Sequence, residues 1–363
     1  MSVFDHAEFD HHEALHFFDD PTTGLKAIIA VHSTALGPAA GGCRRWHYTT
    51  DDDALTDVLR LSRGMTYKNA VAGLPFGGGK SVILASDDAP KSPQLFRAFG
   101  RAVESLNGLY IAAEDVGINV DDIRLAGEET SYVSGLPQHG DSAGGDPSPW
   151  TALGVFLGIR AAAKVRLGKD SLEGISIAVQ GAGHVGSRLC KMLADAGAQI
   201  FVADVNRKNL KQVSTSMQIT AVSPRDILFH DVDILAPCAL GNILNSETIP
   251  RVRAKVIAGA ANNQLATERD GQRLAERGIL YAPDYVINAG GVISIAREHL
   301  GQSSVDEVRA EVSTIPARLE EIFAEAHATE RPTNVVADEL ARRIVANAGD
   351  TDATADLERI QFG

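Results

Sequence analysis

Cysteine is scarce in this chain, which has three, Cys43, Cys190 and Cys238, among 363 residues. They are odd in number and far apart, which excludes a disulfide framework and the paired spacing of a zinc knuckle. The first six residues lack the basic and apolar regions of a signal peptide, and no apolar run approaches the about 18 residues of a membrane span. We therefore expect a cytoplasmic protein with no membrane partner.

Positive charge is also in deficit. The chain carries 34 Lys and Arg against 47 Asp and Glu, which gives a formal net charge of −13. That balance argues against nucleic acid or another polyanion as a partner. The length allows two domains of ordinary size, and 44% hydrophobic with 22% charged residues is typical of a globular protein with substantial cores.

The strongest local signal is a glycine-rich turn at 181–186, which reads Gly-Ala-Gly-His-Val-Gly. An apolar run at 175–180 precedes it, a helical segment at 187–196 follows, and a second apolar run at 198–203 ends at Asp204. This order predicts a dinucleotide-binding βαβ unit, in which the glycines bring backbone N–H groups and a helix N-terminus to a pyrophosphate. Asp204 favours NAD because a carboxylate repels the 2′-phosphate of NADP, whereas Arg207 nearby would favour NADP.

Strand and helix patterns alternate along the chain and predict an α/β fold of two domains, with a doubly wound parallel sheet in the second. Strands are expected at 24–32, 81–84, 110–113, 232–235, 256–259 and 280–282, and helices at 52–71, 92–106, 150–165, 304–329 and 333–348. A polar, glycine-rich passage between Gly135 and Pro149 indicates a hinge. We therefore expect one domain over 1–135, a Rossmann-type domain over 136–330, and C-terminal helices over 331–363 that pack back on the first domain or the hinge.

Two short motifs point to other chemistry. The run at 12–16 matches the H-E-x-x-H zinc-protease signature, but residues 15–18 followed by Asp20-Pro21 resemble a strand entering a hairpin, with His12 and His16 on the solvent side. Residues 77–81, Gly-Gly-Gly-Lys-Ser, resemble the end of a phosphate-binding P-loop. The required first glycine is Leu74, however, and a strand follows where a P-loop needs a helix.

Lys68 and Lys80 both lie in apolar, glycine-rich surroundings. Three glycines before Lys80 would let the backbone press close to a small substrate and leave the amine exposed in a narrow cleft. Two lysines that converge there favour each other's neutral form, and desolvation acts in the same direction, so that one of them can serve as an acid or base. The alternative from the residues alone is a pair of solvated surface lysines.

Eight segments, in order along nearly the whole chain, resemble the leucine/phenylalanine/valine dehydrogenases of the glutamate dehydrogenase superfamily. They are 36–44, 65–68, 77–80, 113–117, 145–148, 236–239, 258–263 and 282–291. The resemblance implies an NAD-dependent amino acid dehydrogenase in which hydride leaves the substrate Cα for NAD, water adds to the imine and ammonia departs, leaving a 2-oxo acid. It also implies a homo-oligomer assembled largely through the first domain, which would bind the substrate.

The resemblance assigns roles to individual residues. Lys68 would grip the substrate α-carboxylate, helped by the backbone of Gly41 and Gly42. Lys80 would activate the water that attacks the imine, and Asp115 would take and return protons. The remaining expected contacts are Asn263 with substrate and nicotinamide ribose, Thr151 with the carboxamide, and Gly181, Gly183, His184, Val185, Gly186, Asp204, Cys238, Ala239 and Asn288 with the cofactor. The residue before Thr151 is Trp150, where the family usually has a small residue.

By the same resemblance the side-chain pocket consists of Ala40, Ala113, Val292 and Ile295. All four are apolar, which implies an aliphatic or aromatic substrate side chain. Ala40 stands where leucine-preferring relatives usually carry leucine and deepens the pocket, whereas Ile295 replaces a more usual valine. Branched-chain and aromatic substrates both remain open, as does the direction of the reaction. Another NAD oxidoreductase or a non-catalytic NAD-binding regulator are the alternatives from other classes.

Overall fold

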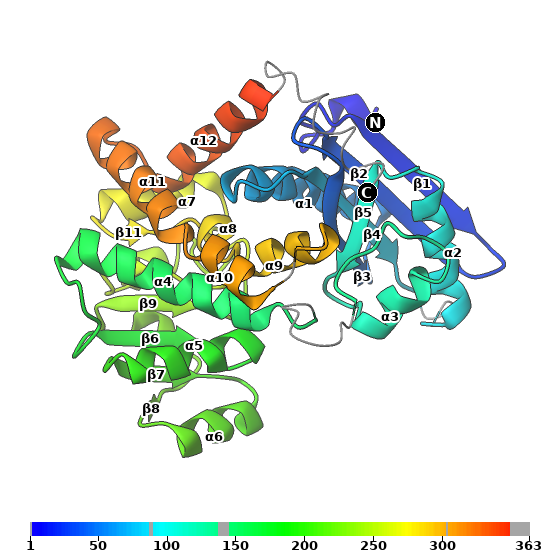
Figure 1. Ribbon diagram of the computed structural model, residues 1–363. Helices are drawn as coiled ribbons and strands as arrows, with labels where there is room; N and C mark the ends of the chain where they lie inside the picture. Colours follow the sequence, from blue (N-terminus) through cyan, green and yellow to red (C-terminus); the bar gives the residue numbers. More distant parts are fainter. Residues whose placement is uncertain (1, 87–89, 137–144, 303, 349–363) are drawn as a thin grey trace. The chain divides into compact units, whose positions relative to one another are not determined.

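The computed structural model describes residues 2–86, 90–136, 145–302 and 304–348 (Figure 1). The chain divides into two compact units, each with its own sheet. The first unit takes residues 1–145, 295–303 and 341–363, and the second takes 146–294 and 304–340. The boundary falls within two helices, α9 (Gly290–His299) and α12 (Thr333–Ala348). None of the described helices is long and apolar enough to cross a bilayer.

The first unit is built on a five-stranded mixed sheet in the order β1-β2-β4-β3-β5. β1 (Ala14–Asp20) and β2 (Leu25–Ser33) form an antiparallel hairpin, which confirms the hairpin expected from the sequence. β4 (Gly77–Leu84) runs antiparallel to β2 and parallel to β3 (Ala39–Trp46), and β3 runs parallel to β5 (Tyr110–Glu114). No strand was expected at 39–46, because its alanines and glycines carry little strand propensity.

Helices cover both faces of this sheet. α2 (Pro93–Glu104) and α3 (Val120–Ala126) contribute Phe96, Phe99 and Ile123 to the larger core on one face, while α1 (Asp51–Val71) packs Ala54 and Val58 against the other (Figure 1). A short 3-10 turn, η1 (Val3–Asp5), precedes the sheet. α1 begins at a capping box of Thr50 and Asp53, with three acids in its first turn and Lys68 in its last, a charge order that suits the helix dipole.

The three glycines before Lys80 belong to β4 itself, so the strand expected at 81–84 begins at Gly77 instead. A Cβ at Gly78 would lie 2.1 Å from the Thr66 backbone nitrogen in α1, and a Cβ at Gly79 would lie 2.7 Å from the Tyr110 ring. At Gly77 it would lie 2.0 Å from the Ser33 oxygen of β2. The glycines therefore let helix, strand and aromatic ring pack directly on the β4 backbone.

The second unit confirms the doubly wound parallel sheet, in the order β11-β10-β9-β6-β7-β8. Its strands are β6 (Ser176–Gln180), β7 (Gln199–Ala203), β8 (Thr220–Ala221), β9 (Ile234–Pro237), β10 (Val256–Ile257) and β11 (Leu280–Tyr281). From β6 the chain builds outward through β7 and β8, then returns to the other side of β6 as β9. The switch point therefore lies between β6 and β9, where such sheets bind their ligands.

Helices and 3-10 turns connect these strands. They are α4 (Ser148–Leu167), α5 (His184–Asp195), α6 (Arg207–Ser216), η2 (Ile227–Phe229), η3 (Ile249–Arg251), α7 (Glu268–Glu276), α8 (Asp284–Ile287), α10 (Val305–Val312) and α11 (Ile315–Thr329) (Figure 1). The single helix expected over 304–329 is two, because the turn at 313–314 precedes Pro316, which lacks the N–H that a continuous helix would need.

His12 is buried at 7% exposure, so the expectation that it faces solvent is wrong. Its Nε2 lies 3.1 Å from the Leu59 carbonyl and 3.0 Å from the Ser62 hydroxyl, and burial lowers its pKa to about 4. His16 lies in β1 rather than on a helix with His12. Across the described residues, no three His, Cys, Asp or Glu side chains gather as a metal site would require. His12 instead fastens the start of the chain to α1.

Replacing Gly78 with alanine tests the packing of α1 on β4. We expect Gly78→Ala to lower the free energy of unfolding by about 1–3 kcal/mol, because backbone has to shift around the new Cβ. The matched control is Gly64→Ala in α1, where a Cβ would meet nothing within 4 Å. It should raise stability by about 0.5–1 kcal/mol through helix propensity. Urea denaturation measures both, and equal effects would contradict this account.

Candidate active site

An ion pair joins the buried Lys80 to the half-buried Asp115 in the first unit. Lys80 projects from β4 with its side chain 7% exposed, and its Nζ lies 2.8 Å from Asp115 Oδ2. Asp115 follows the last residue of β5. The sequence led us to expect the Lys80 amine to be exposed in a cleft. It is instead buried against a carboxylate. An ammonium so deeply buried requires such a partner, because its desolvation is otherwise very unfavourable.

Gly42 makes room for Asp115. A Cβ at Gly42 would lie 2.6 Å from the Glu114 carbonyl oxygen and 2.9 Å from the Asp115 Cβ, so no larger residue fits between β3 and the end of β5. A Cβ at Gly41 would lie 1.9 Å from the Gly79 oxygen. The backbone carbonyl of Gly41 accepts a hydrogen bond from the Tyr110 hydroxyl at 2.6 Å.

Asp115 is held in its ionised form. Burial is the largest influence and raises the pKa of this carboxyl, but Lys80 and then Arg44 oppose it, and together with hydrogen bonds they lower the pKa to about 2. Arg44 Nε lies 3.2 Å from the same Oδ2 that Lys80 contacts. Two cations therefore share one carboxylate oxygen. The sequence analysis gave Arg44 no role, although it ends the first of the segments that carry the resemblance.

The other predicted residues of the first unit lie on the same strands and on α1. Ala40 on β3 is half-buried and pairs with Gly78 of β4, and Ala113 on β5 is buried and pairs with Gly42. Lys68 is half-buried in the last turn of α1. Ile295, in the second half of α9, belongs to the same unit.

The glycine turn of the second unit has the shape that a dinucleotide needs. Gly181 has a φ of +99°, and a Cβ at Gly186 would lie 2.0 Å from the Gly181 oxygen, so the fold itself requires both. Gly183 is different, because a Cβ there would meet nothing within 4 Å. It caps the N-terminus of α5 without a side-chain hydrogen bond. The middle glycine thus leaves open space beside a helix N-terminus, which favours a phosphate group.

Asp204 is braced against this turn. Its Oδ2 accepts a hydrogen bond from the Ala182 backbone N–H at 2.7 Å, and its Oδ1 accepts one from Asn206 at 2.6 Å. The carboxylate therefore holds a fixed place at the end of β7, beside the turn. His184 and Val185 begin α5, the first exposed and the second half-buried. These residues fit a dinucleotide with free ribose hydroxyls near Asp204.

The remaining predicted residues of the second unit lie around the other strand ends. Asn288 is 3% exposed and donates from Nδ2 to the Ala260 carbonyl at 3.0 Å and to Asn262 Oδ1 at 2.7 Å. Asn263 is exposed, with a left-handed φ of +51°. Cys238 and Ala239 follow β9, and a Cβ at Gly181 would lie 2.8 Å from that of Ala239. Val292 is half-buried in the first half of α9.

Thr151 lies in the first turn of α4, where its hydroxyl donates to the Pro147 carbonyl at 3.2 Å. A Cβ at Gly291 would lie 2.5 Å from that hydroxyl oxygen, so this glycine lets α9 begin against Thr151. The unusual Trp150 beside it is buried. Its backbone oxygen would lie 2.1 Å from a Cβ at Gly290. Gly290 and Gly291 thus form a packing contact rather than a plain turn.

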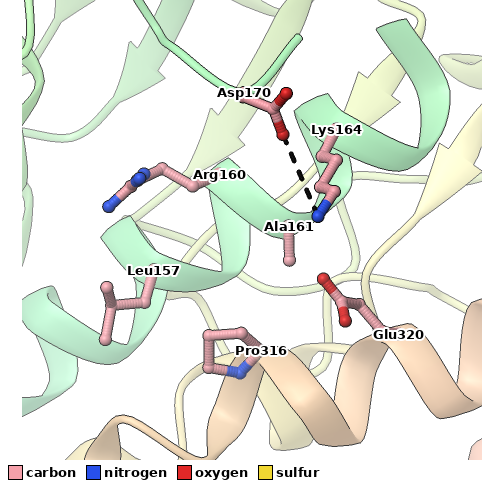
Figure 2. Close-up of a pocket in the computed structure, with 7 residues that line it drawn as sticks. All are labelled: Leu157, Arg160, Ala161, Lys164, Asp170, Pro316 and Glu320. Atoms are coloured by element: carbon pink, nitrogen blue, oxygen red, sulfur yellow. Dashed lines mark ion pairs between the residues drawn. The ribbon is translucent and has the colours of Figure 1, made fainter. Parts of the chain in front are cut away.

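One cavity of the second unit contains none of these residues. It has a volume of about 290 Å³ between α4 and α11 and is lined by Leu157, Arg160, Ala161, Lys164, Asp170, Pro316 and Glu320 (Figure 2). Lys164 Nζ lies 3.9 Å from Asp170 Oδ1 there, and both side chains are largely exposed. We assign no chemistry to this cavity.

Comparison with known proteins agrees with this geometry. Residues 12–132 match the Glu/Leu/Phe/Val dehydrogenase dimerisation domain, and residues 201–349 match the family described as glutamate/leucine/phenylalanine/valine dehydrogenase. The chain is 49% identical to the leucine dehydrogenase of Geobacillus stearothermophilus, over 94% of this chain and 92% of that one.

A solved structure gives the same result. The crystal structure of the L-tryptophan dehydrogenase from Nostoc punctiforme matches with a TM-score of 0.82 at 46% identity, covering 94% of this chain and 98% of that one. The phenylalanine dehydrogenase of Bacillus thermotolerans is 46% identical over 87% of this chain and 83% of that one. The chain belongs to the Glu/Leu/Phe/Val dehydrogenase family, and it is an amino acid dehydrogenase.

The lowered pKa of Asp115 predicts a pH-dependent stability. Since the pKa falls from an ordinary 3.8 to about 2, the stabilisation is complete above about pH 4 and is lost as the pH falls toward 2. Asp115→Asn should lower the free energy of unfolding at pH 7 by about 2 kcal/mol or more, because Lys80 also loses its partner. The difference from wild type should shrink below pH 4, as followed by urea denaturation.

The matched control is Asp121→Asn, since that side chain is 87% exposed and lies 3.9 Å from Arg124. It should change stability by less than about 0.5 kcal/mol. An Asp115→Asn effect that is as large at pH 3 as at pH 7 would show that the ion pairs do not produce it.

Proposed function

We propose that this chain catalyses the reversible NAD-dependent oxidative deamination of an L-amino acid with an apolar side chain, which yields the 2-oxo acid, ammonia and NADH. The observation that carries the proposal is the buried Lys80–Asp115 pair beside Gly42. A general acid–base pair of this kind suits a reaction that adds water to an imine and expels ammonia. In this proposal the first unit binds the substrate and the second binds NAD.

In the proposed mechanism, NAD supplies the acceptor for the hydride that leaves the substrate Cα. Lys68 holds the substrate carboxylate, with the backbone of Gly41 and Gly42. Lys80 orients and deprotonates the water that attacks the imine carbon, and Asp115 exchanges protons with the nitrogen as ammonia forms. Lys80 is one of the two cations that keep Asp115 ionised. Lys80 and Asp115 are in direct contact, so their protons are coupled.

The support for NAD comes from the second unit. Gly183 leaves space at the N-terminus of α5, and Asp204 is fixed where the ribose hydroxyls of the adenosine would lie. A carboxylate in that place repels a 2′-phosphate and so favours NAD over NADP. We place Gly181, Gly186, His184, Val185, Thr151, Cys238, Ala239, Asn263 and Asn288 around the same cofactor.

Two classes of substrate are in competition. The relative with 49% identity acts on leucine, which supports a branched-chain preference. Ala40 supports an aromatic one, because it is small, half-buried and paired in the sheet with Gly78, so that neither residue brings a large side chain to this part of β3 and β4. The relatives named for tryptophan and phenylalanine, each 46% identical, agree with this second candidate. Ala113 and Ile295, which belong to the same unit as Ala40, would complete the pocket in either case.

We also propose a homo-oligomer, which is supported by the match of residues 12–132 to a dimerisation domain. A cytoplasmic location is supported by the three free cysteines, two of them buried.

The test of the proposed function is NADH absorbance with purified protein at alkaline pH. NAD or NADP is supplied with leucine, valine, phenylalanine, tryptophan, glutamate or alanine. We expect activity with NAD and an apolar amino acid, and a loss of at least about 100-fold in kcat/KM for Lys80→Ala. The control is Lys26→Ala, an exposed lysine on β2. Normal turnover by Lys80→Ala, or no activity with the whole panel despite NAD binding, would overturn the proposal.

The role of Ala40 is tested by Ala40→Leu, which narrows the proposed pocket. We expect the ratio of kcat/KM for phenylalanine over valine to fall by about 10-fold or more, because a pocket that changes by a few methylenes discriminates by about 1–3 kcal/mol or more. The ratio within one variant cancels any general loss of activity. An unchanged ratio would show that Ala40 does not line the substrate pocket.

A further inference from the structure

Arg44 links the ion pair of Lys80 and Asp115 to a second carboxylate. Its Nε donates to Asp115 Oδ2 at 3.2 Å, while its NH1 lies 3.2 and 3.0 Å from the two oxygens of Asp57. The Tyr48 hydroxyl donates to Asp57 Oδ2 at 2.6 Å. The network therefore joins β3, α1, β4 and the end of β5 through side chains that are mostly shielded from water.

We propose that Arg44 is a positioning residue for the reaction: anchored by Asp57 and Tyr48, its guanidinium fixes the carboxylate of Asp115 against Lys80. The inference rests on the proposed function, because it assigns Arg44 to the acid–base pair of that reaction. Arg44 acts through Asp115.

The geometry requires a guanidinium. Arg44 directs its Nε toward one acid and its terminal NH1 toward the other, and the plane of the group fixes both directions at once. A lysine would keep the positive charge but has a single nitrogen, so it could not reproduce this fork. Lys80 and Arg44 therefore hold the same oxygen of Asp115, Oδ2, from two directions.

Backbone contacts also fix the positions of Arg44 and Asp115. Arg45 donates its N–H to the Val116 carbonyl at 2.9 Å, and a Cβ at Gly117, whose φ is +79°, would lie 2.1 Å from the Arg45 oxygen. The segment after Asp115 thus lies directly on β3 beside Arg44. Side-chain and backbone contacts together leave Asp115 little freedom to turn away from Lys80.

The charges of the network balance. Two cations, Lys80 and Arg44, face two carboxylates, Asp115 and Asp57, and burial raises the pKa of Tyr48 so that its hydroxyl stays neutral. Loss of the Arg44 charge would leave two carboxylates around one lysine. Every proton in the network would then be bound more tightly, because nearby positive charge has been removed.

The experiment is the pH profile of kcat/KM for wild type, Arg44→Gln and Arg44→Lys, with the preferred amino acid at saturating NAD. We expect the rising limb of the Arg44→Gln profile to move by about one pH unit toward alkaline pH. In Arg44→Lys, which keeps the charge, the limb should stay near that of wild type while kcat falls. A limb that stays in place in Arg44→Gln while kcat falls would overturn the inference, since a merely structural residue gives that result.

The matched control is Arg63→Gln, which removes another half-buried ion pair of the same unit, formed by Arg63 with Glu8 at 3.0 Å. The rising limb of the Arg63→Gln pH profile should stay in place, and a shift equal to that of Arg44→Gln would also overturn the inference. If wild type forms no NADH with any amino acid, the proposed function fails separately. The positioning of Asp115 is then read from the titration of its carboxyl ¹³C signal, assigned with Asp115→Asn. A midpoint about one pH unit higher in Arg44→Gln than in wild type supports the inference, and identical titration refutes it.

Discussion

A lysine ammonium inside a β-sheet has to be neutralised where it lies, and this requirement accounts for much of the first unit. Lys80 is fixed by the backbone of β4, so its partner must come to it. Asp115 can do so only because Gly42 carries no side chain. A second cation, Arg44, is then available to hold the carboxylate in place, and its own charge needs Asp57. Each charge in the network therefore needs a partner of opposite sign, and the network ends at the neutral hydroxyl of Tyr48.

The second unit reaches its site by a different route. That site consists mainly of backbone N–H groups and of the space that glycines leave in the turn between β6 and α5. Local sequence is enough to build such a site, because strand, turn, helix and acid are contiguous. The ion-pair network of the first unit instead assembles side chains from positions 44 to 115, which only the completed sheet brings together.

This difference explains what the sequence could predict. The β-branched strands β2, β6 and β9, the hairpin, helix α1 and the doubly wound sheet were all foreseen. The strand β3 was not, and the glycines of β4 were assigned to a loop, because local propensity treats glycine as a breaker whereas here it permits close packing. The contacts of His12 and Arg44 could not be predicted, because their partners lie far away in the sequence, on α1 and after β5.

The same constraints separate residues that can vary from residues that cannot. An added Cβ at Gly42, Gly78 or Gly186 meets backbone, so these positions are fixed by the fold. Ala40 is half-buried and takes no part in the ion-pair network. In the proposed function Ala40 lines the substrate pocket, so an exchange at this position would change the substrate while the ion pairs stay the same. Relatives at 46–49% identity that are named for leucine, phenylalanine and tryptophan are what such an arrangement would produce. We therefore expect the side chains of the proposed pocket to set substrate specificity, and the glycines and ion pairs to set the type of reaction.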